Sequence, residues 1–109
     1  MSVSEMKLEI REATTRYINI TCKSKETDDP FDFDGFTVQT VLSFNGTKQY
    51  VNTATIENIV SYKIPAEASL GATHGVAETR IFKDGDVFEV LRININVKKA
   101  EKPDIEPAN

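Results

Sequence analysis

Alternation of apolar and polar residues is the dominant pattern in this chain, and its most regular example comes late. In the stretch from Ile81 to Val97, an Asp84-Gly85 turn is followed by a segment in which every second residue is apolar. The apolar positions are Leu91, Ile93, Ile95 and Val97, and they alternate with Arg92, Asn94 and Asn96. A period of two is typical of a strand with one face in the core and the other in water. The sequence therefore predicts a hairpin whose second strand buries its apolar face.

Shorter alternating runs predict further strands. They cover residues 6–10, 18–22, 36–44 and 60–64. Asn45-Gly46 directly follows the third run and predicts a tight hairpin, because both central positions of a type I′ turn need φ > 0. The return strand is predicted through residues 48–56, where Tyr50, Ala54 and Ile56 compete with Val51 for the inward face.

One segment, Pro65 to Leu70, favours a helical turn. Pro65 suits the first position of a helix and Gly71 suits the residue just past its end, but the segment is little longer than one turn. Short strands separated by turns, with no long helix, are typical of a sandwich or barrel. We predict an all-β fold, an immunoglobulin-like antiparallel β-sandwich of about seven strands, in preference to a closed barrel. Its predicted core includes Leu42, Phe44, Ile64, Leu91, Ile93 and Ile95.

The alternation stops after Val97, which sets the predicted domain boundary. Residues 98–109, KKAEKPDIEPAN, contain two prolines, alternating charges and one isolated apolar residue, Ile105. Such a segment is too polar to build a core of its own. We predict a single β-sandwich domain over residues 1–97, followed by a flexible polar tail or linker over residues 98–109.

Composition narrows the class of protein. The chain has 109 residues, of which 39% are hydrophobic and 28% charged, as in ordinary globular domains. The net charge of −4, with no basic run before the tail, argues against nucleic acid as a partner. No apolar run approaches the roughly 20 residues of a bilayer span, and the first residues do not have the features of a signal peptide, so no membrane partner is expected.

Cys22 is the only cysteine, which excludes an intramolecular disulfide and a cysteine-based metal site. It shares a predicted strand face with Ile18 and Ile20. We interpret it as a small apolar core residue rather than a reactive thiol. The chain is accordingly expected to fold in a reducing compartment.

The most chemically suggestive stretch, DDPFDFDG, holds four aspartates, Asp28, Asp29, Asp32 and Asp34. Calcium prefers oxygen ligands, and D-x-D-G is similar to part of a calcium-binding loop. Aligned on its glycine, however, the stretch has Pro30 at the first ligand position and Val41 where a bidentate Glu is required. The simpler interpretation is structural, with Phe31 and Phe33 pointing into the core while Asp32 and Asp34 face water.

The other candidates for catalysis are isolated. His74 is the only histidine and has no neighbouring nucleophile and acid for a triad, nor further ligands for zinc. Glu78 and Arg80 lie two apart and share one predicted strand face, where they could pair with a neighbouring strand as surface ion pairs rather than as a catalytic couple. The sequence has no G-x-S-x-G, P-loop or G-x-G-x-x-G motif. We assign no catalytic, cofactor-binding or metal-ligating residue, and expect neither an enzyme nor a cofactor.

Several motifs follow one another in a recognisable order. PFDFDGFTVQTVL leads into the Asn-Gly hairpin, IVSYKIPAEASLG closes a strand on Ile-Pro-Ala-Glu, and GVAETRIFKDGDVFEVLRININV combines an Ala-Glu-x-Arg-Ile strand with an Asp-Gly-Asp turn. From about Met6 to Val97 this order resembles the N-terminal domain of phage baseplate upper proteins, the modules that join receptor-binding proteins to the tail tip. The resemblance implies an immunoglobulin-like β-sandwich that acts as a structural part of a virion.

Two classes of function remain. The resemblance implies a non-enzymatic phage or prophage protein of the tail or baseplate, made in the bacterial host cytoplasm and carried in the virion. Its partners would be other tail or baseplate proteins. The alternative is a β-sandwich binding module for carbohydrate or peptide, with the aromatic residues Tyr17 and Tyr50 as candidate contacts.

We also expect a homo-oligomer. A sandwich has open sheet edges, to which a partner can add a strand. In the tail, Pro103, Ile105 and Pro107 are suited to an extended arm along a neighbouring subunit. A monomer with a frayed end is the alternative.

Overall fold

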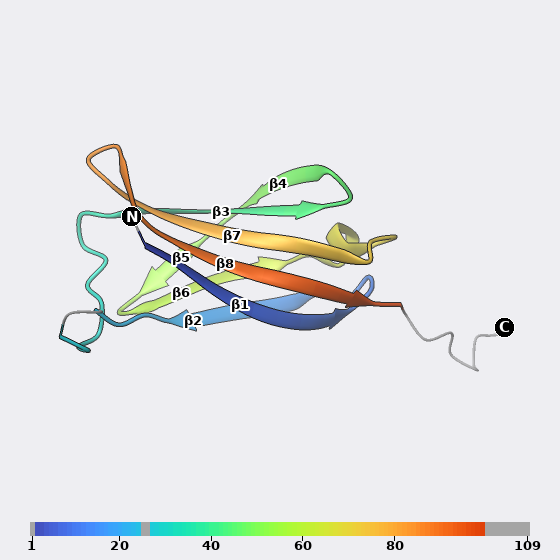
Figure 1. Cartoon of the computed structure of the whole chain (residues 1–109), viewed down its shortest axis with the longest axis horizontal. Coiled ribbons are helices and arrows are strands. Elements are labelled where there is room, and N and C mark those ends of the chain that lie inside the picture. The colour runs from blue at the N-terminus through green and yellow to red at the C-terminus, as the bar shows by residue number, and fades with distance from the viewer. Residues whose placement is uncertain (1, 25–26, 100–109) are drawn as a thin grey trace, which may run out of the picture.

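The computed structural model describes residues 2–24 and 27–99, which form two packed β-sheets (Figure 1). The larger sheet has the strand order β1 (Ser2–Arg11), β8 (Asp86–Lys98), β7 (His74–Lys83), β3 (Thr37–Phe44) and β4 (Thr47–Val51). The smaller sheet has the order β2 (Arg16–Thr21), β6 (Ile59–Ile64) and β5 (Ala54–Ile56). The predicted all-β sandwich is confirmed, with eight strands in the described residues against about seven predicted.

The pairing of β1 with β8 is parallel, which departs from the antiparallel arrangement that we predicted. The other strand pairs in the described residues are antiparallel. After β1 the chain crosses to the smaller sheet as β2, so no tight turn joins β1 to β8 and nothing forces the two to run in opposite directions. Their register places Leu8 beside Ile95, and the apolar positions of both strands therefore share the inner face.

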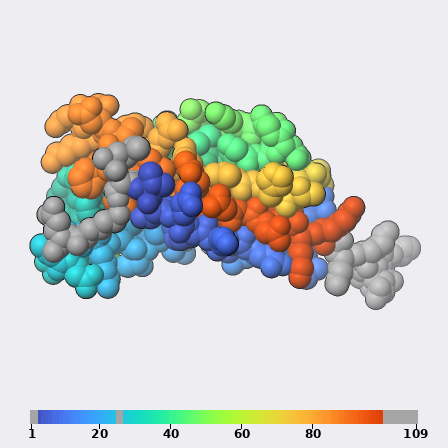
Figure 2. Space-filling model, in the orientation of Figure 1, coloured from blue at the N-terminus to red at the C-terminus, as the bar shows by residue number. Residues whose placement is uncertain are grey.

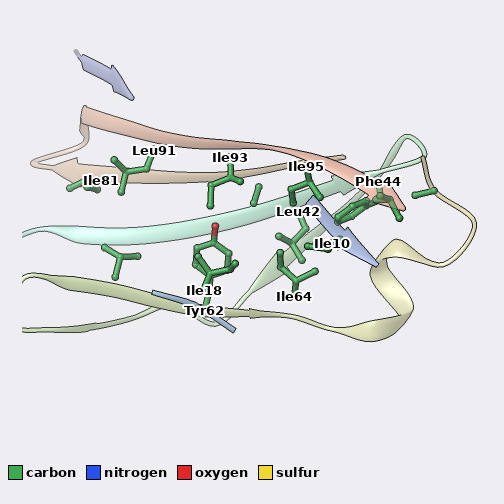
Figure 3. Close-up of a cluster of buried hydrophobic side chains, with 14 of the residues drawn as sticks. Ile10, Ile18, Leu42, Phe44, Tyr62, Ile64, Ile81, Leu91, Ile93 and Ile95 are labelled. Carbon is green, nitrogen blue, oxygen red and sulfur yellow. The ribbon is translucent and has the colours of Figure 1, made fainter. Parts of the chain in front are cut away.

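The core lies between the sheets, and Figure 3 shows side chains from both layers pointing into it. Each predicted core residue is at most 5% exposed: Leu42, Phe44, Ile64, Leu91, Ile93 and Ile95. Asn94 and Asn96 are exposed, as the alternation in β8 predicts. The hydrophobic pattern thus identified the inward face of this strand correctly.

Hydroxyl groups from both sheets are buried among the apolar side chains. Thr40 and Thr79, on neighbouring strands, bond to each other with 2.8 Å between their Oγ1 atoms. Tyr62 reaches up from the smaller sheet (Figure 3), and burial raises its pKa to about 12, with the nearby Thr79 hydroxyl opposing part of the rise. The Tyr62 hydroxyl itself makes no hydrogen bond within the described residues.

The predicted return strand over residues 48–56 is divided between the two sheets. β4 pairs with β3 in the larger sheet, whereas β5 pairs with β6 in the smaller one. Val51 is half-buried, and its competitors Tyr50, Ala54 and Ile56 are exposed. The chain leaves one sheet and enters the other between Val51 and Ala54, so a single alternating register cannot describe both parts.

The predicted helical turn is a 3₁₀-helix, η1 (Ala66–Ser69). Pro65 is its N-cap, in extended conformation, and not its first helical residue as predicted. Ser69 is fully buried, and its Oγ accepts a hydrogen bond from the backbone N–H of Ala13 at 2.9 Å. This contact fixes the connection between β1 and β2 against the short helix.

β8 continues to Lys98, one residue past the predicted end of the domain. The predicted tail, including Pro103, Ile105 and Pro107, lies outside the described residues apart from Lys98 and Lys99. Among the residues that are described, no helix is long and apolar enough to cross a membrane.

Candidate interaction surface

A row of charged side chains crosses three strands on the outer face of the larger sheet. Glu5 of β1 lies beside Arg92 of β8, which in turn lies beside Glu78 of β7. Arg92 donates from Nη2 to Oε2 of Glu78 at 2.7 Å, and from Nη1 to Oε2 of Glu5 at 3.1 Å. Arg80 donates from Nη2 to the other oxygen of Glu78 at 3.0 Å. Glu78 is therefore held between two arginines.

These contacts shift two pKa values. The hydrogen bond from Arg92 is the main cause that lowers the pKa of Glu78, with Arg80 adding to it and partial burial opposing it. The bond to Glu78 likewise raises the pKa of Arg92. The Glu78 side chain is only 15% exposed, so water screens this pair less than an ordinary surface pair.

The sequence predicted that Glu78 and Arg80 share a strand face and could form ion pairs with a neighbouring strand. It did not identify Arg92 as that partner of Glu78, the bond between Arg80 and Glu78 themselves, or the contribution of Glu5. Residues two apart on a strand are evident from spacing alone. Partners on other strands depend on register, which this spacing does not give. The sequence did contain one signal, because Arg92 is the single arginine on the alternating polar face of β8. Its presence there did not show which residue it would contact.

A shallow hollow of about 360 Å³ lies beside the charged row, over β3, β4 and β7. Tyr50 and Lys48 of β4 line it, with Gln39 of β3 and the arginine-held Glu78. Tyr50 is 68% exposed and offers one aromatic surface next to hydrogen-bonding groups. The hollow could bind a small polar group, but a single ring gives little area for stacking.

Tyr17 and Tyr50 do not form a shared platform. Tyr17, 70% exposed, belongs to β2 in the smaller sheet, whereas Tyr50 belongs to β4 in the larger sheet. Ile18 points from β2 into the core, so the neighbouring Tyr17 faces outward on the opposite side of the sandwich from Tyr50. The two candidate contacts of the binding-module hypothesis are therefore separated by both sheets.

One end of the sandwich is closed by a group of phenylalanines, Phe31, Phe33, Phe36 and Phe88, with ring centroids of contacting pairs 4.9 to 5.8 Å apart. As predicted, Phe33 is buried; Phe31 is half-buried. Phe88 is the extra residue at a β-bulge, because Ile81 pairs with Glu89 and Phe82 with Val87. The bulge turns Phe88 toward the other rings, a role that simple alternation could not predict.

The strands β1 and β2 border an open seam between the two sheets. A pocket of about 190 Å³ lies in it, lined mainly by apolar side chains such as Met6, Ile20 and Phe31. Cys22 lines the same pocket, and burial, followed by the nearby Glu89 carboxylate, raises the pKa of its thiol. A raised pKa leaves less thiolate, in keeping with Cys22 as a packing residue.

The aspartate-rich stretch has turn contacts and no assembled metal site. Its four aspartates are exposed, and an oxygen of Asp32 accepts a hydrogen bond from the backbone N–H of Asp34 at 3.0 Å. Within the described part of the chain, no group of three or more His, Cys, Asp or Glu residues is arranged to hold a metal ion. His74 is exposed at the start of β7, and its Nδ1 lies 3.1 Å from the Thr73 hydroxyl.

Comparison with known proteins gives a likeness of fold. No protein-family model matches the chain, and no curated protein matches it. Among solved structures, the N-terminal domain of phage TP901-1 ORF48 is similar with a TM-score of 0.52 and 15% sequence identity, over 91% of this chain and all of that one. InlP of Listeria monocytogenes gives a TM-score of 0.46 and 14% identity, over 88% of this chain and 27% of its own. The chain thus has the fold of a domain found in a phage protein.

Proposed function

We propose that the protein is a non-enzymatic structural component of a phage or prophage virion, in the tail or baseplate, and that it works through protein–protein assembly. The observation that carries the proposal is the fold similarity to the N-terminal domain of phage TP901-1 ORF48, which covers the whole of that domain. The order of sequence motifs that resembles baseplate upper proteins supports the same conclusion.

The surface is suited to assembly. β1 and β4 end the larger sheet, and β2 and β5 end the smaller one, so each sheet presents backbone hydrogen-bonding groups at its edges. The exposed apolar residues are spread over several strands and both sheets: Val3, Tyr17, Tyr50, Ile56, Leu70 and Phe88. A module that is packed among several neighbours would use edges and dispersed contacts of this kind.

Immunoelectron microscopy of virions purified from the organism that carries the gene tests the proposal. An antibody raised against the recombinant protein is expected to place gold at one end of the tail, and the same antibody adsorbed with the protein should place none. Mass spectrometry of the purified particles is the second measurement. If the protein is present in the lysate but absent from the particles, the proposal is wrong.

The alternative, a binding module for carbohydrate or peptide, is supported by Tyr50 beside the polar hollow. Binding to glycan and peptide arrays would distinguish it. A binding module should lose its ligand when Tyr50 is replaced by Ala, while Tyr17→Ala, at a similarly exposed tyrosine on the opposite face, should have no effect. An absence of any array binding would favour the structural role.

A further inference from the structure

The backbone of β1 offers hydrogen-bonding groups at the edge of the larger sheet on alternate residues. Just past the strand, the N–H of Glu12 donates to the carbonyl of Lys98 in β8 at 2.8 Å. In a strand, the backbone N–H and C=O groups of successive residues point alternately toward one lateral edge of the strand and toward the other. Counting back from Glu12, the groups of Leu8 and Ile10 point toward β8, and those of Lys7 and Glu9 point toward the open edge. These odd-numbered residues are the ones that an added strand would bond.

The side chains of the same residues alternate in charge on the outer face. The sequence of these outward positions is Glu5, Lys7, Glu9 and Arg11, all exposed. If a second β1 pairs antiparallel with Leu8 opposite Leu8, then Lys7 faces Glu9 and Glu5 faces Arg11, so that symmetry gives four pairs of opposite charge. A shift of one strand by two residues along the other, in either direction, places like charges opposite each other. The charge pattern therefore selects one register.

The inner side of the strand is complementary in the same register. Met6 would face Ile10 of the second copy, and Leu8 would face Leu8. Met6 and Leu8 are only partly buried in one chain, and Met6 lines the pocket between β1 and β2. Figure 2 shows β1, in dark blue, at the surface of the molecule. β1 also contains no proline, and from Ser4 to Ile10 no charged side chain faces inward, although such features commonly block strand addition at exposed edges.

We propose that two copies of this chain associate through antiparallel pairing of their β1 strands about a twofold axis at Leu8, joining the two larger sheets into one continuous sheet. Such a dimer would supply a partner for the β1 edge of the larger sheet. Only its biological role rests on the proposed virion function. A dimer can exist in a protein with another function, and failure to dimerise would leave assembly with other virion proteins intact.

Charge-reversal variants of the full chain test the proposed register, with dimerisation measured by analytical ultracentrifugation. Lys7→Glu places a second carboxylate opposite Glu9 twice in each dimer, and we expect the dissociation constant of the dimer to increase about tenfold or more. Glu9→Lys should act similarly, because it places two ammonium groups opposite each other.

A mixture of the two variants restores opposite charges. The glutamate introduced at position 7 of one chain then faces the lysine introduced at position 9 of the other, and the unchanged Glu9 faces the unchanged Lys7. A heterodimer should therefore form. Lys48→Glu, the same change on the opposite edge strand β4, is the matched control and should leave dimerisation unchanged.

Disulfide trapping tests the geometry independently. In a Cys22→Ala background, Leu8→Cys places two cysteines in a non-hydrogen-bonded pair with about 4.5 Å between Cα atoms, within the range for a disulfide. Met6→Cys is the control, since the two Met6 positions would lie roughly 14 Å apart along the strands. Covalent dimers are expected from Leu8→Cys only.

Three results would overturn the proposal. They are a monomeric wild-type chain at the highest concentration reached, a mixture of the charge variants that remains monomeric, and cross-linking that is equal at positions 8 and 6. Circular dichroism of each variant separates loss of dimer from loss of fold. If the protein dimerises but is absent from purified virions, the proposed virion function is wrong and the proposed dimer stands.

Discussion

Neighbouring residues of β8 differ sharply in their surroundings. Ile93 is 5% exposed between the sheets, and Asn94 is exposed on the outer face. Removal of a buried aliphatic side chain loses both its transfer free energy and its packing contacts, whereas an exposed amide loses little on truncation. Along β8, the alternation of apolar and polar residues is therefore also an alternation between side chains that contribute much and side chains that contribute little to the free energy of unfolding.

We predict that Ile93→Ala lowers the free energy of unfolding by about 2–5 kcal/mol, while Asn94→Ala changes it by no more than about 0.5 kcal/mol. Urea titration followed by circular dichroism measures both. Equal effects at the two positions would mean that β8 does not present the face described above.

Glu78 gives a prediction for pH. Its folded-state pKa is lowered, chiefly by Arg92, so its stabilising contribution is present above the ordinary carboxyl pKa and is lost as pH falls through the folded value. Glu78→Gln should therefore destabilise the protein at pH 7, and its difference from wild type should shrink below a pH of about 4.5. Thermal unfolding of both proteins across this range measures the effect, and a difference independent of pH would contradict it.

At the level of elements, the tight turns were the features most readily predicted. Gly46 and Gly85 have φ values of +77° and +84°, and the residues before them, Asn45 and Asp84, are also at positive φ. A Cβ built at either glycine has no heavy atom within 4 Å. Any cost of substitution there is therefore conformational and not steric.

We predict that Gly46→Val and Gly85→Val each lower the melting temperature, because a β-branched residue is strained at positive φ. Gly46→Asn is the matched control, since Asn tolerates this conformation and adds a side chain to the same open space. Differential scanning calorimetry is the measurement. Valine variants as stable as the asparagine variant would show that φ does not limit these turns.

Other features of the elements were not predictable from local patterns. Gly75 lies opposite Phe44, and a Cβ built on it would approach the ring to 2.3 Å. The bulge at Phe88 and the parallel pairing of β1 also depend on residues far away in the sequence. Alternation and turn residues predict strands and hairpins, but register and sheet membership are decided by packing between segments.

The candidate surface was predicted less fully than the fold. The sequence identified Tyr17, Tyr50, Glu78 and Arg80 as candidates. It could not place the tyrosines on opposite faces, and it could not identify Arg92 as the neighbouring-strand partner of Glu78. A surface is formed by residues from several strands, and their arrangement follows only when strand order is known. In this molecule β1 and β8 are neighbours although they are distant in sequence.

At the scale of the whole molecule, the buried core is supplied by residues up to Val97, and β8 ends at Lys98. We predict that a chain ending at Lys99 has a melting temperature within about 1 °C of that of the full chain, because its core is complete. Light scattering on both chains also tests the expected role of the tail in association. A large loss of stability on truncation would show that residues 100–109 belong to the domain.

The parallel pair of β1 and β8 has a consequence for synthesis on the ribosome. The Ser4 hydroxyl donates to the Glu89 carboxylate across 85 positions of sequence, so β1 emerges long before its neighbour in the sheet. Until β8 has been translated, the growing chain holds a strand whose apolar face lacks its final neighbour. Such long-range pairing is slow to form, and the unpaired strand is prone to association in the meantime. Chaperones that bind nascent chains would therefore find a long-lived target in β1.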